Sequence, residues 1–216
     1  MGSDFLQMLA ESGRLPPPDT LAAVTGQVSV QVDRAAAIIN HLRDFGRKSD
    51  PLMEHVDINV PLRGVFTIIG HELALQGIEV FLDLRADKPI KAHANRLEQV
   101  FFNLVVNARD AMSETQCPEA TVRPRRIEIQ SQTLEDWVEV TVADTGCGIP
   151  ETARHKIFEP FFTTKETGRG MGLGLAITYG IVKDYGGNIE VDSTPGQGSV
   201  FRLTFPVARE LPEQGT

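Results

Sequence analysis

Four short blocks of residues, all between Asn103 and Leu175, constrain this chain more than any other feature. In order, they read N-L-V-V-N-A-R-D-A-M, D-T-G-C-G-I-P, I-F-E-P-F-F-T-T-K and G-R-G-M-G-L-G-L. The first has the apolar spacing of a helix, the second is a glycine turn, and the fourth is a glycine-rich segment leading into a helix. Each block alone is weak evidence, but together in this order they predict a pocket for a ligand.

The first block places three polar side chains on one helix face. Asn103, Asn107 and Asp110 fall at i, i+4 and i+7 of a helix predicted over about 95–112. Magnesium prefers hard oxygen ligands and keeps water and substrate phosphate in its shell. We therefore interpret Asn107, with its neutral amide oxygen, as the candidate magnesium ligand. The alternative is a capping or solvated face.

The second block follows an apolar strand that ends at Asp144. A carboxylate there can accept a hydrogen bond from an exocyclic amine such as that of adenine. Gly146 and Gly148 let the backbone approach a flat base, whereas ordinary turn chemistry is the alternative. We interpret Cys147 as a small filler, because no neighbouring histidine or lysine would activate its thiol.

The third and fourth blocks predict a cover and a phosphate site. The polar stretch 151–170 contains three phenylalanines, Phe158 among them, which we expect to anchor a mobile segment over a ligand; a surface loop with its rings in the core is the alternative. Lys165 and Arg169 supply positive charge. The glycines that follow match neither the dinucleotide motif nor the P-loop, so we expect a hinge whose following helix offers its N-terminal amides to phosphate.

Composition excludes several classes of protein and of binding site. The net charge of −8 argues against a nucleic-acid partner. Two cysteines in unrelated contexts argue against a disulfide framework or a zinc site. No apolar run approaches the roughly 18–20 residues that cross a bilayer, and the first residues form no signal peptide. We expect a cytoplasmic location, and any inner-membrane anchor would belong to parts of a parent protein outside this chain.

Hydrophobic periodicity divides the chain into a helical part and an α/β part. A helix predicted from about Asp19 to Phe45 carries an apolar stripe that it cannot bury alone, so we expect another helix or chain to cover it. Beyond it the pattern predicts an α+β fold, a two-layer α/β sandwich with helices on one face of a mixed sheet. Helices are predicted over 59–76, 95–112 and 172–185, and strands over 56–59, 78–84, 126–132, 138–144, 189–192 and 199–206.

The four blocks together resemble the N, G1, F and G2 boxes of the ATP-binding domain of bacterial sensor histidine kinases, in the group that includes the gyrase, Hsp90 and MutL ATPases. The resemblance covers 56–207, and A-A-A-I-I-N-H-L-R-D-F-G-R resembles the second helix of the kinase dimerisation domain. It implies a Bergerat-type ATP-binding fold, ATP and magnesium as ligands, a homodimer through the N-terminal helices, and a response-regulator receiver domain as partner. The implied segments are 1–48, a partial dimerisation hairpin; 49–55, a linker; 56–208, the catalytic domain; and 209–216, a tail.

The resemblance also implies roles for individual residues. Asn107 would bind magnesium, and Asp144 would bind the adenine amine. Asn103 and Asp110 would shape the polar wall, and Lys165 would meet phosphate. The full nucleotide-binding set implied is Asn103, Asn107, Asp110, Asp144, Gly146, Gly148, Ile149, Phe158, Lys165, Gly168, Arg169, Gly170, Met171, Gly172, Leu173 and Thr204.

One position separates kinase from hydrolase. The ATP-hydrolysing relatives carry a water-activating glutamate where this chain has Asn103, which cannot act as a general base. We therefore expect the pocket to hold ATP and present its γ-phosphoryl group to a histidine, for onward transfer to a response-regulator aspartate. The alternatives are a gyrase-type ATP hydrolase and a non-catalytic dimerising module.

The acceptor histidine is the missing part of this interpretation. In the family it lies in a pattern like H-[ED]-L-x-x-P before the second helix. His71 is followed by Glu-Leu but has Gln76 at the proline position and lies inside the ATP-binding part, so we interpret it as an ordinary helix residue. We expect the acceptor segment to precede Met1, which leaves no certain catalytic residue in this chain.

Overall fold

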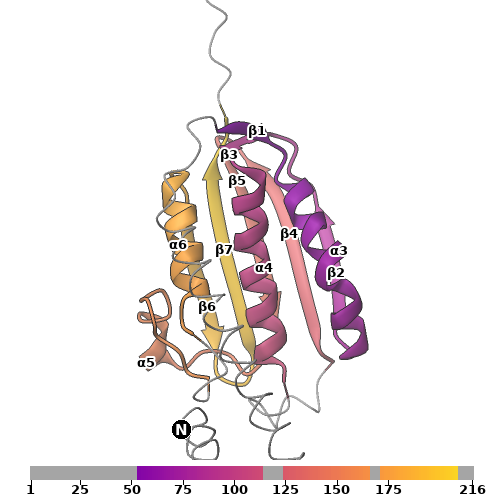
Figure 1. The fold of residues 1–216 in the computed structure, drawn as a ribbon, viewed down its shortest axis with the longest axis vertical. Helices are drawn as coiled ribbons and strands as arrows, with labels where there is room; N and C mark the ends of the chain where they lie inside the picture. The colour runs from indigo at the N-terminus through magenta and orange to yellow at the C-terminus, as the bar shows by residue number, and fades with distance from the viewer. Residues whose placement is uncertain (1–52, 114–123, 166–170, 209–216) are drawn as a thin grey trace, which may run out of the picture. The chain divides into compact units, whose positions relative to one another are not determined.

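The computed structural model describes residues 53–113, 124–165 and 171–208, which form two layers (Figure 1). One layer is a five-stranded sheet with strand order β2-β4-β5-β7-β6. Strands β2 and β4 are parallel, and the other neighbours are antiparallel, so the sheet is mixed. The strands are β2 (Glu79–Leu84), β4 (Arg126–Leu134), β5 (Trp137–Asp144), β6 (Asn188–Thr194) and β7 (Gly198–Pro206).

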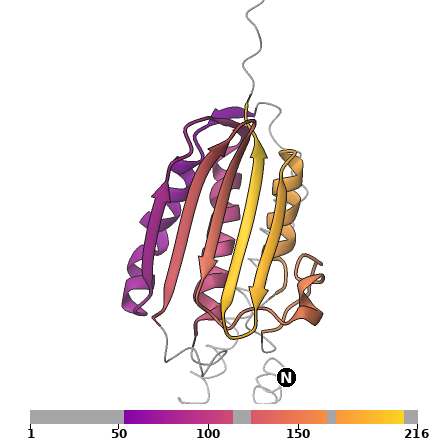
Figure 2. The same cartoon turned by 180° about the vertical axis from the view of Figure 1, so that it is seen from behind.

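Helices form the second layer. The helices α3 (Asn59–Leu75), α4 (Ala94–Ala111) and α6 (Gly174–Asp184) lie side by side on one face of the sheet. On the opposite face, called the open face below, no helix lies among the described residues (Figure 2). This arrangement confirms the predicted α+β sandwich. No helix in the described ranges is long and apolar enough to cross a membrane.

Alternating hydrophobicity positions the strands against the helices. In β5 the side chains of Val138, Val140 and Val142 are buried, and the residues between them are only partly buried. Asp144 continues the buried series, so a carboxylate takes a place where the pattern predicts an apolar side chain. Ser199 occupies the equivalent place in β7 and pairs directly with Asp144. The buried positions of both strands are therefore apolar along most of their length and polar at one end of the sheet.

Helix α4 contributes the centre of the core. Its apolar residues recur at spacings of three and four, which turns one face toward the sheet. The residues buried on this face are Leu97, Val100, Phe101, Leu104, Val105 and Ala108. Asn103, Asn107 and Asp110 flank this face and are half-buried, as their spacing predicted.

The elements differ from the sequence prediction mainly where they are short. The first strand, β1 (Glu54–Val56), ends before the predicted 56–59 because helix α3 already begins at Asn59. Strand β3 (Ile90–Ala92), which pairs with β1, and helix α5 (Glu151–Arg154) were not predicted, since three or four residues carry too little periodicity. The predicted hairpin 1–48 and tail 209–216 lie outside the described residues, and the domain boundaries stay predictions.

Candidate functional site

Strand β5 and helix α4 end on the same side of the domain (Figure 1). Asp144 is the last residue of β5, and Asn107 and Asp110 lie in the last turns of α4. The turn that follows β5 is attached to the last residue of α4, because the Cys147 N–H donates to the carbonyl oxygen of Ala111 at 3.0 Å. Asp144 on the sheet and Asn107 on the helix are thereby held at the same end of the two layers. Two of the four sequence blocks thus meet at one place.

Asp144 is a buried carboxylate stabilised by neutral donors. The Gly146 N–H donates to its Oδ1 at 2.8 Å, and Ser199 donates from both its backbone and its hydroxyl. Burial raises the pKa of Asp144 to about 6, and these hydrogen bonds pull the pKa back only in part. The group is therefore mainly ionised at neutral pH and has lone pairs left to accept a hydrogen bond from a base amine.

Ser199 is a site residue that the sequence reasoning missed. It is buried, pairs with Asp144, and lies 3.1 Å (Oγ to Oγ) from Ser193, another buried hydroxyl. The signal was present in the alternation of β7, where Phe201 and Leu203 are buried and Ser199 has the same parity.

The glycine turn is shaped by its protein neighbours. Gly148 has φ of +70°, and a Cβ there would lie 2.2 Å from the carbonyl oxygen of Thr194, so only glycine fits. The next residue, Ile149, donates its N–H to the Ser193 hydroxyl at 2.7 Å. The turn is thus locked to the β6–β7 hairpin. This packing, rather than approach to a base, is the visible reason for glycine at this position.

The polar face of α4 meets a cation from the third block. The Lys165 ammonium donates to Asp110 Oδ2 at 2.5 Å and to Asn107 Oδ1 at 3.3 Å. Arg109 donates to the other oxygen of Asp110 at 2.8 Å and, through a second nitrogen, to Glu72 on α3, also at 2.8 Å. Lys165 was predicted for this neighbourhood from the sequence, whereas Arg109 was not.

Asn103 has a structural partner on α6. Its amide nitrogen donates to the carbonyl oxygen of Gly174 at 3.1 Å and approaches Thr178 Oγ1 at 3.4 Å. The side chain therefore joins α4 to the first turn of α6. A glutamate at this position could not donate these hydrogen bonds. Asparagine at position 103 therefore has a structural role in joining α4 to α6, besides its lack of a basic group.

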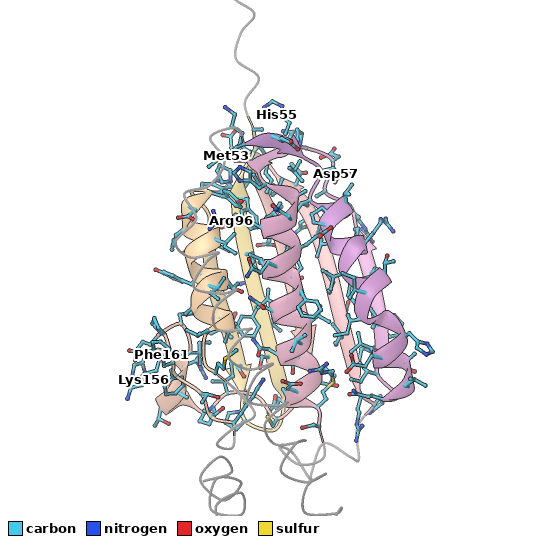
Figure 3. All side chains as sticks on the ribbon, in the orientation of Figure 1. Met53, His55, Asp57, Arg96, Lys156 and Phe161 are labelled. Carbon is cyan, nitrogen blue, oxygen red and sulfur yellow. The ribbon has the colours of Figure 1, made fainter. Side chains whose placement is uncertain are left out.

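The phenylalanines of the third block divide into two kinds. Phe158 packs against the core and lies 5.5 Å, ring to ring, from Tyr179, and Phe162 also packs on the core. Phe161 is 72% exposed and has φ of +67° (Figure 3). Two rings therefore anchor the segment, as expected, and the third stays in solvent.

The fourth block is described only in part. Gly172 has φ of +65°, and a Cβ there would lie 2.4 Å from the Phe162 carbonyl oxygen, which explains a glycine in this turn. Met171 and Leu173 are half-buried beside it, where α6 begins. The expected roles of Gly168, Arg169 and Gly170 fall outside the described residues and stay predictions.

Thr204 is not brought to this site, contrary to the prediction. It lies five residues beyond Ser199 along β7 and pairs with Glu139 and Asn188, far from the end that carries Asp144. An odd spacing along a strand also reverses the face. Its side chain therefore points to the open face, between the buried Leu203 and Phe205.

The donor set fits magnesium held together with phosphate. The described ranges contain no group of three or more His, Cys, Asp or Glu residues suited to bind a metal alone. However, Asn107 Oδ1 and Asp110 Oδ2 already converge on a cation, the Lys165 ammonium. One or two protein oxygens completed by water and substrate phosphate are the usual shell of magnesium in phosphoryl-transfer sites.

Comparison with known proteins identifies the family to which this part of the chain is similar. Residues 92–209 match the family described as histidine kinase-, DNA gyrase B-, and HSP90-like ATPase. Sensor kinase CckA of Brucella abortus (strain 2308) is 39% identical over 215 residues, 95% of this chain and 22% of that protein. Two-component sensor PprA of Pseudomonas aeruginosa is 34% identical, over 88% of this chain and 20% of that protein. The chain thus spans about a fifth of the length of these curated relatives.

Solved structures agree in fold. The catalytic domain of histidine kinase ThkA is 32% identical with a TM-score of 0.61, covering 72% of this chain and 95% of that one. ThkA in complex with the response regulator protein TrrA is 26% identical with a TM-score of 0.71, covering 99% and 58%. Full-length ShkA in complex with AMPPNP is 26% identical with a TM-score of 0.69, covering 92% and 41%.

Proposed function

The chain belongs to the histidine kinase-, DNA gyrase B- and HSP90-like ATPase family, and from this premise we propose that it is the ATP- and magnesium-binding catalytic part of a two-component sensor histidine kinase. Its nucleotide would donate the γ-phosphoryl group to a histidine of a phosphoacceptor helix outside the described residues. Onward transfer would reach an aspartate of a response regulator. We also propose that this part works in the cytoplasm.

The observation that carries the proposal is the arrangement of Asp144 and Asn107. A buried carboxylate with free lone pairs, at a strand end, suits the exocyclic amine of adenine. An amide oxygen at the end of the adjacent helix suits magnesium. The two are held at the same end of the domain by the contact between Cys147 and Ala111. A nucleotide whose base binds at Asp144 would direct its phosphates toward α4 and Lys165.

The side chains of the proposed site would position the nucleotide and screen the charge of its phosphates, rather than activate water. Magnesium, when bound, neutralises phosphate charge, and phosphoryl transfer needs mainly positioning and such stabilisation. Lys165 adds a positive charge beside Asn107. Asn103 is occupied with α6 and has no basic atom to take a proton from water. These features favour transfer to a better nucleophile over hydrolysis.

Partners follow from the same proposal. We propose a homodimer formed by the N-terminal helices and a receiver domain of a response regulator as the recipient of the phosphoryl group. The support is the sequence pattern of the predicted helix to Phe45, together with the solved complex of ThkA with its response regulator protein TrrA. The curated relatives are sensor kinases in their own descriptions.

Calorimetry of ATP and ADP, with and without magnesium, tests the nucleotide site. We expect binding by the wild type, loss of binding in Asp144→Asn, and an altered metal dependence in Asn107→Asp. The substitution Lys156→Met is a matched control, since that lysine is exposed and lies away from α4 (Figure 3). Absence of nucleotide binding by the wild type would refute the proposal and favour the dimerising module.

Transfer is tested separately with radiolabelled ATP and a longer polypeptide that carries the acceptor helix. Label on the acceptor histidine, with little free phosphate, is the expected outcome. Rapid release of phosphate without a labelled protein would instead favour the gyrase-type hydrolase.

A further inference from the structure

The Lys165 ammonium lies against the polar face of α4, beside the side chain that the proposed function assigns to magnesium. Its Nζ lies 3.3 Å from Asn107 Oδ1, the proposed magnesium ligand, and 2.5 Å from Asp110 Oδ2. The ammonium is thus bound by the oxygen of the proposed metal ligand and by the carboxylate one turn further along α4. The side chains of Lys165 and Asp110 are only 19% and 24% exposed, so water screens this contact incompletely.

The surrounding charges balance with Lys165 in place. Glu72, Arg109, Asp110 and Lys165 form a chain of alternating sign, linked by ion pairs of 2.8, 2.8 and 2.5 Å. Adding a divalent cation at Asn107 would put it beside an ammonium in a partly buried place, where like charges repel strongly. Removing the ammonium would leave an excess negative charge next to a neutral oxygen ligand.

From this geometry, and resting on the proposed function, we propose that Lys165 is the resident cation of the metal position when no nucleotide is bound. Its ammonium and magnesium exclude each other from Asn107 Oδ1. Phosphate groups bring the negative charge that lets Lys165 leave α4 and meet the nucleotide, so that metal enters only together with nucleotide. The domain without nucleotide would then reject free divalent cations.

The alternative explanation is that Lys165 and Asp110 form only an ordinary surface ion pair, and it leads to a different expected result. Such a pair is worth about 0–1 kcal/mol and would affect stability slightly without affecting metal binding. The exchange described above requires that removing the ammonium create a metal site. Binding of metal alone, without nucleotide, therefore separates the two explanations.

The test is titration of the nucleotide-free protein with Mn²⁺, with the concentration of the free ion measured by electron paramagnetic resonance. Wild type should bind Mn²⁺ weakly, and Lys165→Met should bind one ion at least tenfold more tightly. Lys165→Gln should show the same gain, which guards against misfolding of one variant. Lys165→Arg, which keeps the charge, and Lys156→Met, nine residues earlier, should behave like wild type.

The location of the gained site is tested by a second substitution. Asn107→Ala in the Lys165→Met background should abolish the gain, because the amide oxygen would no longer be available. Equal Mn²⁺ affinities of wild type, Lys165→Met and Lys165→Gln would overturn the inference. So would a gain that survives Asn107→Ala.

Nucleotide calorimetry on the wild type distinguishes failure of this inference from failure of the proposed function. If ATP with magnesium binds while the Lys165 variants gain no metal site, the function stands and the exchange is wrong. If ATP does not bind at all, the proposed function is wrong, and the exchange that rests on it is overturned as well.

Discussion

Replacing Asp144 by asparagine should remove nucleotide binding and yet stabilise the protein at neutral pH. The carboxylate is buried, and its described partners Gly146 and Ser199 are neutral donors. Ionising a buried carboxyl group costs free energy of folding, and its raised pKa of about 6 measures that cost. Asparagine fills nearly the same volume without a charge.

The magnitude follows from the pKa. Its rise from the ordinary 3.8 to about 6 means that the folded state binds the proton more tightly than the unfolded state. The free energy of unfolding therefore decreases as pH rises between these two values and is constant above the higher one. Each pKa unit corresponds to about 1.4 kcal/mol, so the whole loss is about 3 kcal/mol. Asparagine avoids it but gives up one hydrogen bond from Ser199, worth about 1 kcal/mol.

Urea unfolding of both proteins, followed by circular dichroism, measures the difference. Relative to wild type, Asp144→Asn should gain about 2 kcal/mol between about pH 4.5 and about pH 7.5, and be the more stable protein at the upper end. Asp110→Asn is a control, because that carboxylate is paired with two cations and its loss should destabilise. A stability difference between wild type and Asp144→Asn that does not change with pH would refute the reasoning.

Four further outcomes are expected. Gly148→Ala should lose about 2 kcal/mol or more because of its positive φ and close carbonyl neighbour, whereas Gly180→Ala, in α6 with open space at its Cβ, should gain about 0.5–1 kcal/mol; equal melting temperatures would contradict both. Asn103→Asp replaces a donor to the Gly174 carbonyl by an acceptor, so urea unfolding should show a loss of about 1–3 kcal/mol, and an unchanged midpoint would argue against this bond. ATP affinity, measured by calorimetry at fixed magnesium, should fall as pH drops through about 6 because protonated Asp144 loses acceptor capacity; an affinity that holds to about pH 5 would contradict its role.

The sequence predicted the parts of this fold that repeat regularly. The 3.6-residue period of α4 and the alternation in β4, β5 and β7 were long enough to be read directly, and they place Asp144 and Asn107 correctly on their elements. Strand β3 and helix α5 were missed because their lengths of three and four residues carry no period. Their formation depends on partners distant in sequence, such as the pairing of β3 with β1.

Some residues of the candidate site could be predicted from the sequence and others could not. Side chains on one helix, such as Asn103 and Asn107, share a face by geometry alone. Ser199 was overlooked and Thr204 wrongly chosen, although the alternation of β7 already separates them, because Ser199 shares the parity of the buried Phe201 and Thr204 does not. Only the pairing of Ser199 with Asp144 required the register of β7 against β5. The contact of Lys165 with Asp110 joins residues 55 positions apart and likewise required the fold.

The position of the chain's entry into this domain has a structural consequence. The polypeptide enters the described domain through Met53 (Figure 3) and β1, beside β3 and the start of α4, whereas Asn107 and Asp110 lie in the last turns of that helix. The 18 residues of α4 span about 27 Å, and Asn107 lies about 20 Å along the helix from its first residue. The described domain is therefore entered at the end opposite to Asp144 and Asp110. Whatever is joined to the chain at Met53 is therefore attached away from the residues of the proposed nucleotide site.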